Sequence, residues 1–210
     1  MRKLYLAVWF LLPVALGAYH LGPGQDRLRI DDAARSLEEA AAHAARAAAL
    51  PEEEAPAAAA EWARAVQAYT AALRDLPADR VSAQRAARLE LARCRMFVAG
   101  LPEANAELQS LVEEMAADEG ADPALLRDAR RALAGSQYYL TWLMRLEGVG
   151  REEWEPVIEA ARQTYKLLAE EDAAGADEEG ARRSREDLES AIRLARMELN
   201  ELQGLPLPSQ

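Results

Sequence analysis

Apolar and polar side chains alternate with the spacing of an amphipathic α-helix along most of this chain. No segment keeps a period of two for long enough to form a strand, so the pattern predicts an all-α fold. Because the connections are short, successive helices should pack as antiparallel pairs. The predicted helices span residues 31–50, 57–76, 78–99, 102–118, 123–147, 152–171 and 179–203.

Prolines and glycines mark the ends of these helices. Pro51 and Pro77 cannot continue a helix, and Gly100 is typical of a helix C-terminus. Asp122 followed by Pro123 predicts a capped start, because an aspartate accepts free backbone N–H groups and a first-turn proline has no N–H to leave unpaired.

The first 25 residues have a different pattern. Arg2 and Lys3 are followed by no charged side chain until Asp26, which predicts an export signal or a membrane anchor at residues 1–25. Small residues support cleavage after Gly17, whereas the length of the apolar run supports an uncleaved transmembrane helix in the inner membrane. In both cases the rest of the chain should lie outside the cytoplasm.

Composition narrows the class of partner. The chain has 25 basic and 36 acidic side chains and a net charge of −11, which argues against binding to nucleic acid. Its only lysines are Lys3 and Lys166, with arginine supplying the other positive charges, and this bias is typical of GC-rich bacteria. We therefore expect a protein of the bacterial cell envelope, either anchored in the inner membrane or released into the periplasm.

One segment carries a repeat signature. In EWARAVQAYTAALRDLP, the residues Ala65, Tyr69, Ala72 and Pro77 have the A-x3-Y-x2-A-x4-P spacing of the second helix of a tetratricopeptide repeat (TPR). Small alanines let a neighbouring helix approach, the tyrosine fills the gap, and the proline ends the helix. The chain thus resembles a degenerate TPR protein, a resemblance that implies protein binding.

Weaker echoes follow at Ala161 with Tyr165, and at Gly135 with Tyr138, where small residues suit close helix crossings. Other echoes lie at Ala104, Leu108, Leu111 and Leu168. The spacing from Ala65 to Ala104 is 39 residues, longer than the usual 34. We expect a short TPR-like solenoid within one domain, residues 31–203, with the last helix as a cap and residues 204–210 as an extended tail; a plain helical bundle is the alternative.

A second resemblance extends over the whole chain. The segments MRKLYLAVW, EWEPVIEAARQTYKLLAEE and LARMELNELQGLPLPSQ resemble exported repeat proteins encoded in bacterial Bat-like loci. That resemblance implies von Willebrand-type or MoxR-type proteins as partners.

Candidate chemistry is sparse. His20, His43 and Cys94 share no metal-ligand spacing, so we expect no metal and no cofactor. Cys94 has no second cysteine to pair with and should be a small buried apolar residue, and His43 should fill a surface or a groove. The adjacent acidic pairs mostly flank loops, where they favour helix N-termini or contact water. We therefore expect no enzymatic activity.

An aromatic segment gives the predicted binding site. Tyr139, Trp142, Arg145 and Trp154 cover more than one face of the helix at residues 123–147 and the turn after it. Either this helix is buried between two neighbours, or one aromatic face lines a groove that holds a partner protein. The leading hypothesis is a non-catalytic envelope scaffold or adaptor; the alternatives are an envelope hydrolase with paired carboxylates, acting on a small ligand or a polymer, and a structural spacer.

Overall fold

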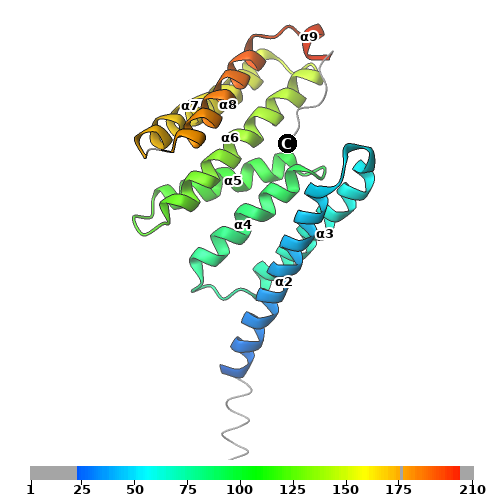
Figure 1. Ribbon diagram of the computed structural model, residues 1–210, viewed down its shortest axis with the longest axis vertical. Coiled ribbons are helices and arrows are strands. Elements are labelled where there is room, and N and C mark those ends of the chain that lie inside the picture. The colour runs from blue at the N-terminus through cyan, green and yellow to red at the C-terminus, as the bar shows by residue number, and fades with distance from the viewer. Residues whose placement is uncertain (1–22, 176, 204–210) are drawn as a thin grey trace, which may run out of the picture. The chain divides into compact units, whose positions relative to one another are not determined.

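The computed structural model describes residues 23–175 and 177–203 (Figure 1). These residues form eight α-helices and one short 3-10 helix, and no strand occurs among them. The predicted all-α class is therefore confirmed. The predicted N-terminal hydrophobic helix, the cleavage site at Gly17 and the extended tail lie outside the described residues. The chain divides into two compact units between Ala87 and Arg88, and the predicted domain 31–203 spans both.

The first unit is built on a helical hairpin. α2 (Pro23–Ala49) packs against α3 (Ala55–Asp75) across a turn that contains the 3-10 helix η1 (Glu52–Glu54). The buried side chains of α2 recur every seven residues and are all alanine, whereas those of α3 are alanine and tyrosine. Small side chains at this spacing let the two helix axes approach closely. The buried residues are Ala33, Ala40, Ala47, Ala65, Tyr69 and Ala72.

The start of α2 differs from the prediction. The helix begins at Pro23, eight residues before the predicted start at Asp31. The intervening sequence has no helix-breaking residue after Gly24, so the helix runs through Asp31 instead of starting there. α4 (Val81–Met96) begins in this unit and continues past the division.

In the second unit, the helices follow one another as packed neighbours. α5 (Leu101–Ala116) packs on α6 (Pro123–Leu146), α6 on α7 (Arg151–Ala174), and α7 on α8 (Glu178–Arg196). Arg88 of α4 forms ion pairs with Glu107 and Glu114 of α5, both at 2.6 Å. Figure 1 shows these helices in chain order from green to orange.

Two apolar cores hold this unit together. One joins α4, α5 and α6 around Leu89, Leu108 and Met115. The other joins α6, α7, α8 and the short α9 (Leu199–Gln203) around Trp142, Ile158 and Leu202. α6 contributes to both cores, which is why apolar side chains occupy more than one of its faces.

The predicted helix boundaries hold where local signals are strong. Asp122 Oδ1 accepts the N–H of Ala124 at 2.9 Å, which confirms the predicted cap of α6. Gly148 has a φ of 76°, a left-handed conformation that favours glycine in the turn before α7. The final helix, predicted as continuous over 179–203, is instead broken at Met197, where the backbone leaves the helical conformation with a φ of −57° and a ψ of 145°. No proline or glycine causes this break.

Candidate functional site

Three of the four predicted partner-binding residues are buried in the chain's own core. Trp142, Arg145 and Trp154 are 6%, 8% and 8% exposed. Tyr139 is half-buried on α6, with its ring 5.5 Å from that of Tyr138 in an edge-to-face arrangement. The structure therefore favours a buried α6 over an aromatic groove, because side chains this covered cannot contact a partner while the fold is intact.

Arg145 explains the break between α8 and α9. Its guanidinium donates to the backbone carbonyls of Leu194 and Met197, the last of which lies at the break itself. The same guanidinium lies 4.7 Å from the ring centroid of Trp154, within cation–π range. Burial lowers the pKa of Arg145 from its usual value. The guanidinium of Arg145 therefore donates hydrogen bonds to backbone carbonyls at the end of α8 that have no partner within the helix.

The predicted repeat-packing residues fall into two separate groups. Ala65, Tyr69 and Ala72 are buried in the first unit, with Pro77 in the turn that follows α3. The remaining four residues belong to the second unit, where Ala161 and Tyr165 of α7 are buried and Gly135 and Tyr138 lie on α6.

The crossing at Gly135 is less tight than the sequence suggests. A Cβ atom added at Gly135 would lie 3.8 Å from the hydroxyl oxygen of Tyr165, an ordinary van der Waals distance. The space at this crossing would therefore accept a methyl group, so glycine is not sterically required there.

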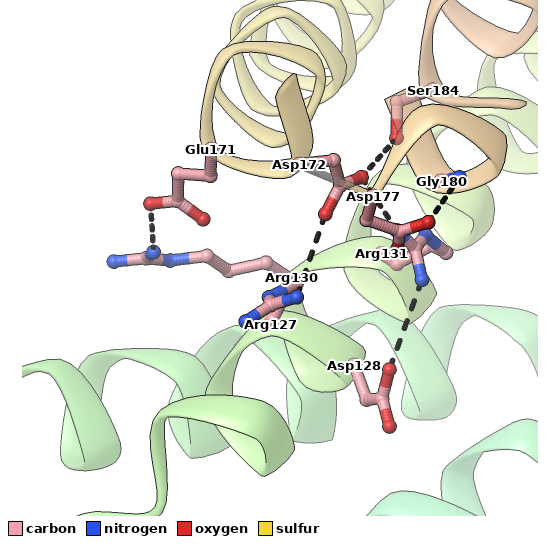
Figure 2. Close-up of polar contacts among 9 residues, drawn as sticks. All are labelled: Arg127, Asp128, Arg130, Arg131, Glu171, Asp172, Asp177, Gly180 and Ser184. Atoms are coloured by element: carbon pink, nitrogen blue, oxygen red, sulfur yellow. Dashed lines mark hydrogen bonds and ion pairs between the residues drawn. The ribbon is translucent and has the colours of Figure 1, made fainter. Parts of the chain in front are cut away.

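A buried ionic cluster, which the sequence did not indicate, joins α6, α7 and α8. We call it the Asp172 centre; it comprises Asp172, Arg127, Arg131 and Ser184 (Figure 2). Asp172, in the last turn of α7, is 1% exposed. Its Oδ2 accepts from Arg131 Nη2 at 3.1 Å and from the Ser184 hydroxyl at 3.0 Å. Arg127 Nη1 lies 3.6 Å from Oδ1.

The turn between α7 and α8 is shaped around this carboxylate. The backbone N–H of Asp177 donates to the carbonyl of Asp172 at 2.9 Å, and Asp177 Oδ1 caps α8 by accepting from Gly180 N–H. A Cβ atom at Gly180 would lie 3.1 Å from Asp172 Oδ2 and far closer to the Asp177 carboxylate. Glycine therefore lets α8 begin directly against the Asp172 centre.

The neighbouring acid behaves differently. Glu171 pairs with Arg130 at 3.1 Å, with both side chains partly exposed. Figure 2 shows Glu171 and Asp172 extending from α7 toward separate arginines of α6. The two acids thus each face arginines of α6 instead of each other, an arrangement that suits helix docking better than acid–base catalysis.

Asp187 lies near the tyrosines of α6 and α7. Burial raises the pKa of Asp187, although Arg131 and Arg183 oppose the shift. Burial is the largest cause of the raised pKa of Tyr138, Tyr139 and Tyr165, and the Asp187 carboxylate adds to the rise in each case. The pKa of Tyr139 is raised to about 12. The charged form of Asp187 therefore destabilises the folded state.

A second polar cluster lies at the tip of the α2–α3 hairpin. Glu61, whose side chain is 15% exposed, accepts from Arg46 Nε at 3.0 Å and from Arg64. His43 Nδ1 lies 2.7 Å from the same carboxylate, so His43 is not the simple filler that the sequence suggested. Hydrogen bonds from His43 and Arg46 lower the pKa of Glu61 to about 2.

The hairpin cluster borders an open hollow of about 530 Å³. Arg46, Glu61 and Arg64 form its charged side. Its remaining walls are short apolar side chains from the end of α2 and the start of α3, namely Ala49, Leu50, Ala57 and Ala60.

Metal and thiol chemistry find no support in the described part of the chain. No group of three or more His, Cys, Asp or Glu side chains lies close enough there to hold a metal ion. Cys94 is 1% exposed, as predicted for a small buried apolar residue, and burial raises the pKa of its thiol to about 12. Within residues 23–203, apart from 176, no helix is long and apolar enough to cross a membrane.

Comparison with known proteins identifies no relative of this chain. No protein family, curated protein or solved structure matches this chain.

Proposed function

We propose that this protein is a non-catalytic scaffold of the bacterial cell envelope that binds another protein through the surface of its stacked helices. The observation that supports the proposal is the order of packing, in which α5 packs on α6, α6 on α7 and α7 on α8. Packing between successive neighbours is typical of repeat proteins, which bind partners over extended surfaces. The space between these helices is filled by their own side chains, so recognition falls to the outer faces.

We also propose that the helix pairs are TPR-like. α3 and α7 would be second helices of repeats, because each buries an alanine and a tyrosine four residues apart: Ala65 and Tyr69 in α3, Ala161 and Tyr165 in α7. α6 would be the first helix of the repeat that contains α7, and α8 the cap. The packing of α6 against α7 and of α7 against α8 supports this assignment.

The envelope location is proposed from the sequence of residues 1–25. Its basic start and its uncharged run are those of an export signal or an inner-membrane anchor. N-terminal sequencing of the protein purified from cells distinguishes cleavage after Gly17 from an intact anchor. Recovery of the full-length chain in the cytosolic fraction would contradict both forms of the proposal.

Photo-crosslinking in intact cells tests the scaffold role. Leu143 on α6 and Leu167 on α7 suit a photoreactive residue, because they are almost equally exposed, at 39% and 40%, on different helices. A partner bound to one outer face of the stack covers only part of its surface, so we expect one position to crosslink to an envelope protein and the other to serve as the control. Equal crosslinking from both positions, or none from either, would contradict a single binding face.

A further inference from the structure

The hollow at the tip of the α2–α3 hairpin is the described site that is best built for a ligand. It combines charged groups held in fixed positions with an apolar wall, and all its residues belong to the first unit. Glu61 orients the two arginines, since Arg46 Nε and Arg64 Nη1 both donate to its carboxylate. One acid therefore fixes two guanidinium groups beside the same opening.

The arginines keep donors for a second anion. A guanidinium carries five N–H groups, and each arginine directs only some of them toward Glu61. The side chains of Arg46 and Arg64 are 55% and 58% exposed, so their other N–H groups are accessible from the hollow. Because Glu61 stays ionised, with its pKa lowered to about 2, the three groups together carry one net positive charge.

This local charge has the opposite sign to that of the chain as a whole, which is −11. A monoanionic carboxylate balances this single net positive charge, whereas a doubly charged phosphate would leave one negative charge uncompensated in the site. The apolar wall, formed by Ala57, Ala60 and Leu50, suits the methylene groups of a glutamate or aspartate side chain.

We propose that this hollow binds the side-chain carboxylate of an acidic residue on a partner protein, with Arg46 and Arg64 as the binding residues and Glu61 as the residue that positions them. The proposal rests on the proposed scaffold function and specifies one contact of it. The carboxylate accepts from the guanidinium groups, and its methylenes cover the alanine wall.

Peptide binding to the full chain provides the test. The probe is the acetylated, amidated tripeptide Ala-Glu-Ala, and its matched control is Ala-Gln-Ala with the same end groups. Binding is followed through the NMR signals of the His43 ring, which lies 2.7 Å from Glu61 and is one of only two histidines in the chain. The expected result is a saturable shift with a dissociation constant on the order of millimolar for the glutamate peptide, as suits one surface contact, and at least about tenfold weaker binding for the glutamine peptide.

Variants locate the effect. The double variant Arg46→Gln and Arg64→Gln should abolish the shift, because it removes both binding residues. Both side chains are exposed, so their loss should leave the hairpin packing intact. Arg74→Gln, an equally conservative change in the last turn of α3, should leave binding unchanged. Retained binding in the double variant, equal binding of the two peptides, or no saturable shift at all would overturn the proposal.

The source of the carboxylate is tested separately. An acetylated Ala-Ala-Ala peptide with a free C-terminus carries the same anion at the chain end, and we expect it to bind several-fold more weakly than Ala-Glu-Ala. If it binds as tightly, the assignment to an acidic side chain is wrong. If the peptides fail to bind while photo-crosslinking still captures an envelope partner, the hollow loses its role and the scaffold function stands.

Discussion

Replacing Asp172 should destabilise the second unit far more than replacing its neighbour Glu171. Asp172→Ala removes the acceptor of the Ser184 hydroxyl, which is fully buried, and a hydrogen bond to a charged group contributes about 1.5–3 kcal/mol. In the ion pair with Arg131, the carboxylate is buried and the guanidinium is partly exposed to water, so this pair adds up to about 1 kcal/mol. We expect the free energy of unfolding to fall by about 3 kcal/mol in total. This is at the low end of the usual cost of breaking a buried ion pair, because the arginines keep contact with water.

Glu171→Ala is the matched control. This adjacent acid also pairs with an arginine of α6, but both side chains are partly exposed, so its loss should cost about 0.5 kcal/mol. Asp172→Asn keeps an acceptor for Ser184 and loses only the charge, and should lie between the two. The ranking separates the effect of burial from that of the arginine pair itself.

The assay is unfolding in urea, monitored by the chemical labelling of Cys94. This thiol lies in the second unit and is buried with its pKa raised to about 12, so it should react with a thiol reagent only when that unit opens. Circular dichroism reports the helices of both units in parallel. A difference of less than about 1 kcal/mol between Asp172→Ala and Glu171→Ala, with unchanged denaturant dependence, would refute the reasoning.

Four further predictions concern single sites. Arg145→Gln should cost about 2 kcal/mol, because it leaves two carbonyls at the end of α8 without a charged donor, and hydrogen exchange should quicken in α9. Gly135→Ala should stabilise the protein by about 0.5–1 kcal/mol in thermal unfolding, because α6 gains helix propensity and the Tyr165 hydroxyl leaves room; a destabilised variant would show that the crossing is tight. Glu61, with its pKa lowered from 4.5 to about 2, stabilises the folded state fully above pH 4.5 and loses this effect as the pH falls toward 2, so Glu61→Gln should flatten the acid limb of a stability–pH curve. Asp187 has the opposite effect on stability, because its raised pKa means that its charge destabilises the folded state at neutral pH. Asp187→Asn should therefore be more stable than the parent protein at neutral pH and equally stable below about pH 3.8. Equal stability of the variant and the parent at both pH values would contradict this.

Local sequence signals predicted most of the helix boundaries. The cap formed by Asp122 and Pro123 and the stop at Pro77 act within one turn of helix, so neighbouring residues are enough to define them. The buried state of Cys94 also followed from the sequence, because a lone cysteine among helix-forming residues is most often a small buried apolar residue.

The candidate sites could not be predicted in the same way. Arg131, Asp172 and Ser184 are separated by up to 53 residues, and each appears in the sequence as one of many ordinary surface residues. Only the packing of α6, α7 and α8 brings them together. His43 and Glu61 are likewise joined by the hairpin, and only the small alanines of α2 and α3 were a sign in the sequence that these helices approach closely.

The sequence by itself determined that the chain is helical and where most of its helices end, because helix periodicity, caps and breakers act over a few residues. Tertiary structure decided which faces are covered. The aromatic segment around Trp142 looks the same in sequence whether it lines a groove or fills a core, and the contacts of α6 with its neighbours decide that it fills a core. The break at Met197 has the same origin, since no local breaker is present and the carbonyls there bind Arg145 from a helix about 50 residues earlier in the chain.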